Sequence, residues 1–203
     1  MLRVGVYGGA FSPIHNGHIA AAKAFMERMW LDVLFVVPTG NGPWKDISKG
    51  AVSARDRLRM CELAFEGVEG IIVSDIEIRR SEPSYTVDTL RQLHDEDRRL
   101  FLLCGTDVIM KIGDWDDADE LFSLCYPTYI RRESDEAMDE QIIERIAEYK
   151  QKYGKNVVKI VAPVNEISSS EVRRMIADGE DISGVVPQEV ADYIKEKGLY
   201  LEV

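Results

Sequence analysis

The sequence predicts an α/β fold, with an open sheet of parallel strands and helices on both faces. Residues 4–37 show the pattern strand, glycine turn, helix and strand, which is a βαβ unit. Two runs, 34–37 and 100–104, are apolar throughout, as expected of parallel strands that are buried on both faces. Helical and strand patterns then alternate along the rest of the chain, which favours the same architecture.

The first unit contains the feature that points most directly to function. Residues 4–7 suit a short buried strand, Gly8 and Gly9 break it, and apolar residues at helical spacing over 18–29 predict a helix that begins near Asn16. The glycines let backbone N–H groups approach a ligand, and the helix directs its positive end to the same place. We therefore expect an anion to bind there.

The later elements follow from the same periodicities. Ser53 and Asp56 resemble a capping box that opens a helix ending near Gly67. Further strands are predicted at 71–78, 126–130 and 157–161. Further helices are predicted from 84, with Thr86 as a candidate N-cap, over 135–152, from 168 and over 187–200. The inward face of the 135–152 helix is expected to carry Ile142, Ile143, Ile146 and Tyr149.

Length and composition limit the class of protein. A chain of 203 residues is long enough for one domain, over 1–203, with a core of its own. Cys61, Cys104 and Cys125 lie far apart in apolar segments, so we expect reduced core thiols in a cytoplasmic protein. No apolar run reaches the roughly 18 residues of a membrane span. The net charge of −11 argues against nucleic acid as a partner but leaves room for a small anion.

Two histidines stand at the predicted start of the first helix. His15 and His18 are three residues apart, so both imidazoles should project from the first turn on one side. A glycine pair alone is usually only a turn, and a single histidine is usually structural. The joint pattern of strand, Gly-Gly, Pro13 and His-x-Gly-His is far more specific. This joint pattern resembles the signature of the nucleotidyltransferases that are related to class I aminoacyl-tRNA synthetases. Those nucleotidyltransferases bind ATP through the His-x-Gly-His motif.

Three other residues have both a functional and a structural interpretation. Lys45, in the predicted loop 39–50, could contact phosphate or be an ordinary exposed lysine. Asp107, just after Gly105 and a buried strand, could accept hydrogen bonds from a ribose or cap a helix. Trp115 stands among aspartates, where its ring could stack on a ligand or pack against a helix. The residues alone leave these alternatives open.

A late segment carries a second anion signal. Ser168, Ser169 and Ser170 supply more hydroxyls than one N-cap needs, and Arg173 follows near the positive end of the same predicted helix. A cation in that position is unfavourable by roughly 0.3–1 kcal/mol, which a bound anion would offset.

This segment makes the resemblance specific. Residues 167–173 resemble the Ile-Ser-Ser-Thr-x-Ile-Arg segment of bacterial nicotinate-nucleotide adenylyltransferases, and the likeness extends over nearly the whole chain. The matching positions are 8–18, Lys45, 85–90, 105–107, Trp115, Arg132, 168–173, 186–187 and 193–194.

The resemblance implies a Rossmann-like nucleotidyltransferase fold and an adenylyl transfer from ATP to nicotinate mononucleotide. The products are nicotinate adenine dinucleotide and pyrophosphate, in NAD biosynthesis. The implied catalytic residues are His15, His18, Lys45 and Arg173. The implied ATP-binding residues are Gly8, Gly9, Ala10, Phe11, His15, His18, Gly105, Asp107, Ile167, Ser168, Ser169, Ser170 and Arg173. The implied mononucleotide-binding residues are Lys45, Tyr85, Thr86, Trp115 and Arg132. The helices from about 169 would complete the ATP site, and Mg²⁺ would arrive with ATP rather than at a protein metal site.

Five positions depart from the family pattern. These are Ala10, Ser12, Trp44, Glu133 and Ser170, which stand where other residue types are usual. They bear on substrate preference more than on reaction class. The alternatives are a related transferase for nicotinamide mononucleotide or another phosphorylated acceptor, and a non-catalytic nucleotide sensor. The sequence leaves the oligomeric state open, a homo-oligomer included.

Overall fold

We analysed a computed structural model of the chain, which describes residues 1–40, 52–130, 136–161 and 167–201. Lys45 and Trp44 lie outside the described residues, as do Arg132 and Glu133. The predicted loop 39–50 is described only at its first two residues. The roles assigned to these side chains therefore stay predictions.

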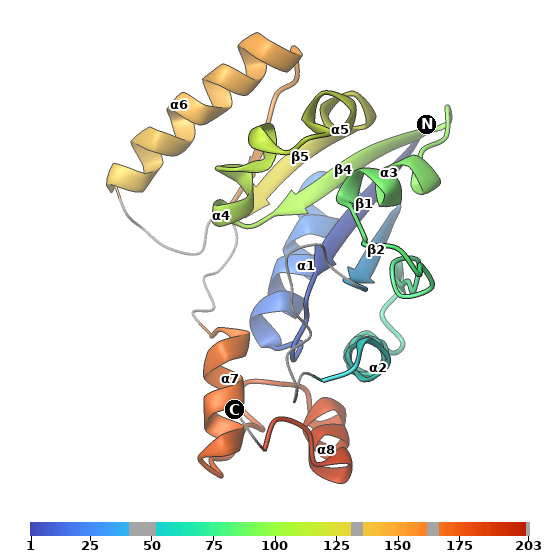
Figure 1. The fold of residues 1–203 in the computed structure, drawn as a ribbon, viewed down its shortest axis with the longest axis vertical. Helices are drawn as coiled ribbons and strands as arrows, with labels where there is room; N and C mark the ends of the chain where they lie inside the picture. The colour runs from blue at the N-terminus through green and yellow to red at the C-terminus, as the bar shows by residue number, and fades with distance from the viewer. Residues whose placement is uncertain (41–51, 131–135, 162–166, 202–203) are drawn as a thin grey trace. The chain divides into compact units, whose positions relative to one another are not determined.

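The described strands form one sheet, in the order β3-β2-β1-β4-β5-β6 (Figure 1). Parallel pairing joins β1 to β4, β4 to β5 and β5 to β6. The strands are β1 (Leu2–Gly9), β2 (Val33–Pro38), β3 (Ile71–Val73), β4 (Arg98–Cys104), β5 (Cys125–Ile130) and β6 (Val158–Ile160). Helices lie on both faces, so the predicted open parallel α/β fold is confirmed.

The chain divides into two compact units that alternate along the sequence. Unit 1 consists of Met1–Tyr7, Ala21–Phe35 and Thr86–Val164, and unit 2 of Gly8–Ala20, Val36–Tyr85 and Asn165–Val203. Both β1 and β2 run from one unit into the other, as does the first helix, α1 (Asn16–Met29).

Unit 1 contains most of the sheet and its core. Its further elements are α3 (Thr86–Leu93), α4 (Thr106–Ile109), the 3₁₀ turn η1 (Ile112–Asp114), α5 (Ala118–Leu124) and α6 (Glu136–Tyr153). A Cβ on Gly5 would lie 2.5 Å from Leu31 and 3.0 Å from Phe25. The missing side chain therefore lets the end of α1 and the following residues pack closely on β1.

Unit 2 contains α2 (Ala54–Ala64), α7 (Ser169–Ala177) and α8 (Gln188–Lys197). The predicted cap of α2 is confirmed, because the Asp56 amide donates to the Ser53 hydroxyl over 3.1 Å. Asp56 also accepts a 2.9 Å hydrogen bond from the Tyr193 hydroxyl, which ties α2 to α8.

The structure corrects four local predictions. The strand predicted at 71–78 ends at Val73, because the chain turns at Asp75, whose carbonyl accepts from the Arg79 amide. Strand β1 continues through Gly9 instead of breaking at the glycines. Thr86 is the first helical residue of α3 rather than its cap. Ile143 is 66% exposed, so α6 buries a narrower face than its pattern indicated.

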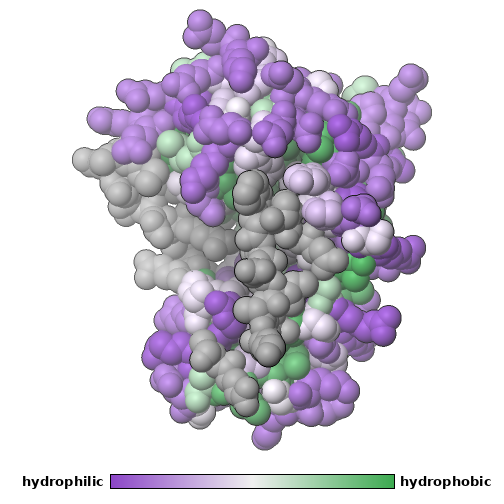
Figure 2. All heavy atoms as spheres, in the orientation of Figure 1, coloured by the Kyte–Doolittle hydropathy of each residue, from purple (hydrophilic) through white to green (hydrophobic). Residues whose placement is uncertain are grey.

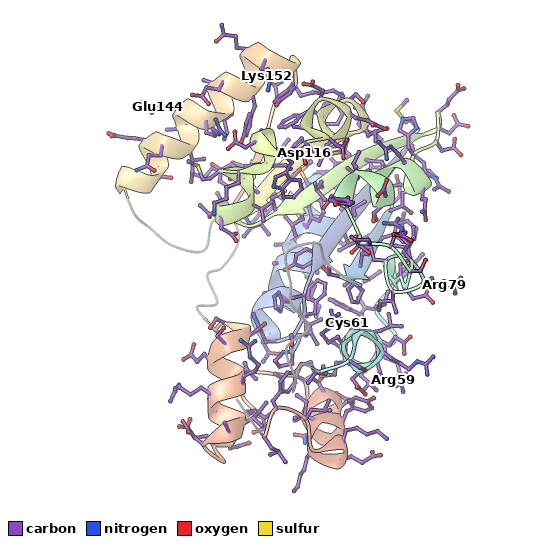
Figure 3. All side chains as sticks on the ribbon, in the orientation of Figure 1. Arg59, Cys61, Arg79, Asp116, Glu144 and Lys152 are labelled. Carbon is purple, nitrogen blue, oxygen red and sulfur yellow. The ribbon has the colours of Figure 1, made fainter. Side chains whose placement is uncertain are left out.

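The hydrophilic surface and the buried cysteines agree with the many charged residues and with the apolar segments around the cysteines in the sequence. The described residues on the face seen in Figure 2 are mostly hydrophilic, and Glu144 projects outward from α6 in Figure 3. All three cysteines are buried and unpaired by disulfides, and burial raises the pKa of each thiol. Among the described helices, none has the length and apolar character required to cross a bilayer.

A buried arginine organises the end of the first two strands in unit 2. Arg57 lies on the inner face of α2 with Met60 and Cys61. Its guanidinium donates to the Ala10 carbonyl over 2.6 Å and to the Thr39 carbonyl over 2.5 Å. Burial lowers the pKa of this guanidinium, whereas the nearby Tyr200, Cys61 and Glu77 favour its charged form. The planar fork thus satisfies two carbonyls that follow β1 and β2.

We expect Arg57→Lys to destabilise the protein by about 1–3 kcal/mol, because a single ammonium cannot reproduce the fork and leaves one carbonyl without its donor. The free energy of unfolding is measured by urea denaturation.

The matched control is Arg59→Lys on the same helix. Arg59 points outward in Figure 3 and pairs with Glu62 at the surface, so its change should stay within about 0.5 kcal/mol. Equal losses in the two variants would contradict a structural role for the Arg57 fork.

Candidate functional site

The segment between β1 and α1 folds around one aromatic ring. Phe11 is buried and has a φ of 44°, a conformation in which the chain turns sharply after the strand. A Cβ on Gly9 would lie 3.0 Å from the Phe11 ring, so the ring packs tightly against the backbone at position 9. The edge of Phe11 then contacts the His18 ring, with centroids 5.0 Å apart. Phe11 thus packs between the backbone at Gly9 and the His18 ring.

The two histidines lie together, as the sequence predicted. Their rings are stacked, with centroids 3.7 Å apart, and His15 is only 1% exposed. The backbone amide of His15 donates to Nδ1 of His18 over 3.3 Å. Because Nδ1 accepts, the neutral ring of His18 carries its proton on Nε2. His18 is therefore prepared to donate a hydrogen bond from Nε2.

The start of α1 favours an anion. The carbonyl of His15, the residue before α1, accepts from the amides of His18 and Ile19, and the first turn of the helix contains no acidic residue. The Asn16 amide donates to the Val185 carbonyl over 2.9 Å, which anchors this helix start to the C-terminal segment. The positive end of the helix dipole is thus uncompensated by any carboxylate of its own first turn.

Helix α7 docks on the same segment through its first residues. The Ser169 hydroxyl donates to the Pro13 carbonyl over 2.9 Å, and Arg173 Nη1 donates to the Ser12 carbonyl over 2.7 Å. Arg173 Nη2 also donates to the Ser170 hydroxyl over 3.0 Å. Ser168 caps the helix by accepting from the Glu171 amide. Each of the three serines therefore has a separate partner, and Ser168 is the N-cap.

Unit 2 thus brings most of the predicted phosphate-handling residues to one segment. His15 and His18 stand at its end, and Arg173 is bonded to its middle at Ser12. Two imidazoles, one guanidinium and a helix N-terminus can together stabilise several phosphate oxygens. Within this unit, the start of α7 is therefore hydrogen-bonded to the segment that leads into α1.

Two further departures from the family pattern, Ser12 and Ala10, have structural partners. The Ser12 hydroxyl lies 3.1 Å from the Tyr200 hydroxyl, near the end of the described chain. Burial raises the pKa of Tyr200 to about 12, so this hydroxyl stays protonated. Ala10 takes part through its backbone carbonyl, which accepts from Arg57. The contact at position 10 therefore needs no particular side chain.

Arg57 and Tyr200, which contact the segment between β1 and α1, were not predicted from the sequence. The spacing of Arg57 with Met60 and Cys61 was an available signal, because it places an arginine on the apolar face of a helix. Tyr200 offered no comparable signal, since its partner lies 188 residues away.

Unit 1 contains the candidates Gly105, Asp107, Trp115 and Thr86. Gly105 precedes α4, and Asp107 lies in its first turn, where a Cβ on Gly105 would be 2.8 Å from the Asp107 carboxylate. Trp115 follows η1 and is 38% exposed, so it does not pack in the core. Thr86 begins α3, whereas Tyr85, just before it, belongs to unit 2 and is exposed.

Among the described side chains, no three histidines, cysteines or carboxylates gather closely enough to hold a metal ion. The candidate groups in unit 2 are imidazoles and a guanidinium, which suit phosphate oxygens better than a cation.

Comparison with known proteins identifies the family. The model of the cytidylyltransferase-like family matches residues 6–175. A protein of Desulfatibacillum aliphaticivorans, named probable nicotinate-nucleotide adenylyltransferase, is 35% identical over 98% of this chain and 100% of its own length. A protein of Dehalococcoides mccartyi with the same name is also 35% identical, over 98% of this chain and 97% of its own.

Solved structures show the same fold. The nicotinic acid mononucleotide adenylyltransferase of Plasmodium falciparum, in complex with NaAD, superposes with a TM-score of 0.75 at 22% identity and full coverage of both chains. A second structure of that enzyme, in complex with APC, gives a TM-score of 0.74 at 23% identity. With a family model over most of its length and relatives above 30% identity along nearly all of it, the chain belongs to the nicotinate-nucleotide adenylyltransferases, nucleotidyltransferases of NAD biosynthesis.

Proposed function

We propose that this chain joins the AMP moiety of ATP to nicotinate mononucleotide. A phosphate oxygen of the mononucleotide attacks the α-phosphorus of ATP and forms the new P–O bond. The bond from the α-phosphorus to the oxygen that bridges it to the β-phosphate breaks, and pyrophosphate leaves with that oxygen. No protein nucleophile is required, so the enzyme acts by alignment and by stabilising charge. The observation that carries this proposal is the gathering of His15, His18 and Arg173 on one segment of unit 2.

We assign the triphosphate to that segment. His18 donates from Nε2 to an α-phosphate oxygen, where negative charge grows in the transition state. Arg173 and Lys45 neutralise the leaving pyrophosphate, and the backbone around Gly9 and Ala10 contacts the phosphates. His15 holds His18 through its stacked ring and its amide. Further ATP contacts are assigned to Gly8, Phe11, Gly105, Asp107, Ile167, Ser168, Ser169 and Ser170.

The mononucleotide is assigned to Trp115, Tyr85, Thr86, Arg132 and Lys45. Trp115 stacks on the pyridine ring, because its ring is exposed although it is large and apolar. The backbone at Tyr85 and Thr86 contacts the nicotinate carboxylate, and Arg132 and Lys45 contact the phosphate. The Plasmodium falciparum relative, described in complex with NaAD, supports a dinucleotide product for this fold.

Magnesium is proposed to bind with the substrate. Phosphate oxygens and water are the ligands that Mg²⁺ prefers, and the ion would neutralise charge on the triphosphate. The cationic side chains of unit 2 would then contact the phosphate oxygens that remain exposed.

Pyrophosphate release tests the assignment directly. Purified protein is incubated with ATP and one acceptor. Separate reactions contain nicotinate mononucleotide, nicotinamide mononucleotide or another phosphorylated acceptor. Release with nicotinate mononucleotide at the highest kcat/KM supports the proposal. A preference for another acceptor would move the chain to a neighbouring specificity, and no release with any acceptor would indicate a nucleotide sensor.

We expect His18→Ala to lower kcat by about 10²–10³-fold, because one preorganised donor to the transition state is lost. Steady-state pyrophosphate release measures kcat. His94→Ala is the control, since His94 is an exposed histidine just after α3, in unit 1. An unchanged kcat for folded His18→Ala would refute the role of the imidazole.

We expect Trp115→Ala to raise the KM for nicotinate mononucleotide by about tenfold, because stacking on a ring contributes about 1–3 kcal/mol. The KM for ATP should change by less than about twofold. Trp30→Ala serves as the control, because Trp30 is 78% exposed at the end of α1. If both Michaelis constants rose equally, Trp115 would have no stacking role.

A further inference from the structure

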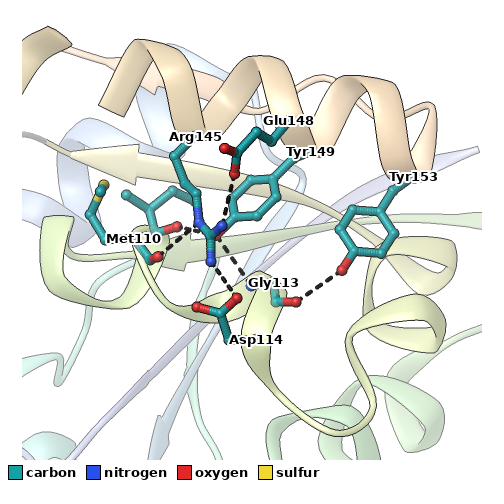
Figure 4. A network of polar contacts seen from close by, with 8 residues as sticks. Met110, Gly113, Asp114, Arg145, Glu148, Tyr149 and Tyr153 are labelled. Atoms are coloured by element: carbon teal, nitrogen blue, oxygen red, sulfur yellow. Dashed lines mark hydrogen bonds and ion pairs between the residues drawn. The ribbon is translucent and has the colours of Figure 1, made fainter. Parts of the chain in front are cut away.

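Helix α6 holds the segment that leads to Trp115. This segment, residues 109–114, connects α4 to Trp115 through η1, and all of it belongs to unit 1 together with α6. Figure 4 shows that Arg145, Tyr149 and Tyr153 reach it from one side of α6. We refer to these three side chains as the α6 brace.

Tyr149 makes the central contacts of the brace. It is buried, and its hydroxyl donates to the Ile109 carbonyl over 2.8 Å and accepts from the Gly113 amide over 3.2 Å. Burial raises the pKa of this hydroxyl, so it keeps the proton that it donates. A Cβ on Gly113 would lie 2.2 Å from the Tyr149 ring, so the segment passes directly against that ring. One hydroxyl thereby fixes the backbone at both ends of a five-residue stretch.

Arg145 fixes the segment 109–114 at two further points. Its Nε donates to the Met110 carbonyl over 3.1 Å and to the Tyr149 hydroxyl over 3.1 Å. Its Nη2 pairs with the Asp114 carboxylate, and its Nη1 pairs with Glu148 over 2.8 Å. These bonds hold its pKa well above the usual range. Asp114, held in this way, is the residue directly before Trp115.

The third member, Tyr153, completes the contacts. Its hydroxyl donates to the Gly113 carbonyl over 3.0 Å, and its ring stacks on Phe122 with centroids 4.0 Å apart. Phe122 also packs against Tyr149, with centroids 5.0 Å apart. The brace is therefore itself anchored on α5.

The brace does not have the character of a second ligand site. Its residues border an open hollow of about 470 Å³ that also includes Gln151 and Lys152. The cation of Arg145 is paired with two carboxylates, and the Lys152 ammonium lies 4.8 Å over the Tyr153 ring. A ligand would have to displace these contacts. Four contacts to the backbone of one short segment indicate positioning instead.

We propose that Arg145 and Tyr149 are positioning residues that set the place of the Trp115 ring for the pyridine ring of nicotinate mononucleotide. This inference rests on the proposed function, in which Trp115 stacks on that substrate. The Trp115 side chain is 38% exposed, yet the residue before it is fixed by Arg145, and the Trp115 carbonyl accepts from the Ala118 amide. The backbone that carries the Trp115 ring is thus fixed before the substrate binds. Less conformational entropy is then lost on binding.

The test is a double-mutant cycle between Tyr149→Phe and Trp115→Ala, read as the KM for nicotinate mononucleotide. Tyr149→Phe keeps the ring against Phe122 but removes the hydroxyl from Ile109 and Gly113. We expect the KM for this substrate to rise about 3- to 10-fold, as loss of a buried hydrogen bond allows, with the KM for ATP and kcat within about twofold. In the Trp115→Ala background the same substitution should have no further effect on that KM.

Tyr126→Phe is the matched control, because Tyr126 lies in β5 of the same unit and its ring packs on Phe101. Should Tyr149→Phe fail to fold, Arg145→Lys replaces it in the cycle, since lysine keeps the charge near Asp114 but lacks the Nε donor to Met110.

Each outcome decides the question. A rise in KM that requires Trp115 supports the inference. An equal rise in both backgrounds, an equal rise for both substrates, or no rise at all overturns it. If Trp115→Ala alone leaves the KM unchanged, the stacking role in the proposed function fails, and the inference fails with it. A large effect of Trp115→Ala with none of Tyr149→Phe rejects the brace alone.

Discussion

The site in unit 2 depends on the hydrogen bond from Arg173 to the carbonyl of Ser12. This bond and its neighbour, from Ser169 to Pro13, hold the start of α7 against the segment between β1 and α1. A guanidinium near the positive end of its own helix is unfavourable by itself, and the carbonyl offsets part of that cost while leaving the positive charge in place. An anion bound beside this guanidinium would offset the remaining cost, which is the role proposed for the triphosphate.

The sequence was sufficient for the fold because the signals were local. The apolar runs at 34–37 and 100–104 appear as the buried strands β2 and β4, and the helix expected near Asn16 begins at that residue. The errors were also local. The alternation of apolar and polar residues over 71–78 is longer than strand β3, which ends at Val73. The alternation continues into a turn at Asp75, which a period of two does not predict.

The placement of His15 beside His18 was predictable, because residues three apart at a helix start lie on one side of it. The site was not predictable where a polar side chain acts on a distant backbone group. Arg57 reaches the carbonyls of Ala10 and Thr39, and Tyr149 reaches the Ile109 carbonyl and the Gly113 amide. Nothing in the sequence indicates which backbone groups a distant polar side chain will contact. Such residues become visible only when the fold shows what their burial would otherwise cost.

The contacts at Ser12 also fix an order of events during protein synthesis. Its partners Arg173 and Tyr200 are added to the growing chain 161 and 188 residues later. Translation must therefore reach the last helices before the segment between β1 and α1 can take its final form, because loop closure of this length cannot precede the residues that close it. A nascent chain on the ribosome would contain His15 and His18 long before Arg173 is synthesised and can bond to Ser12.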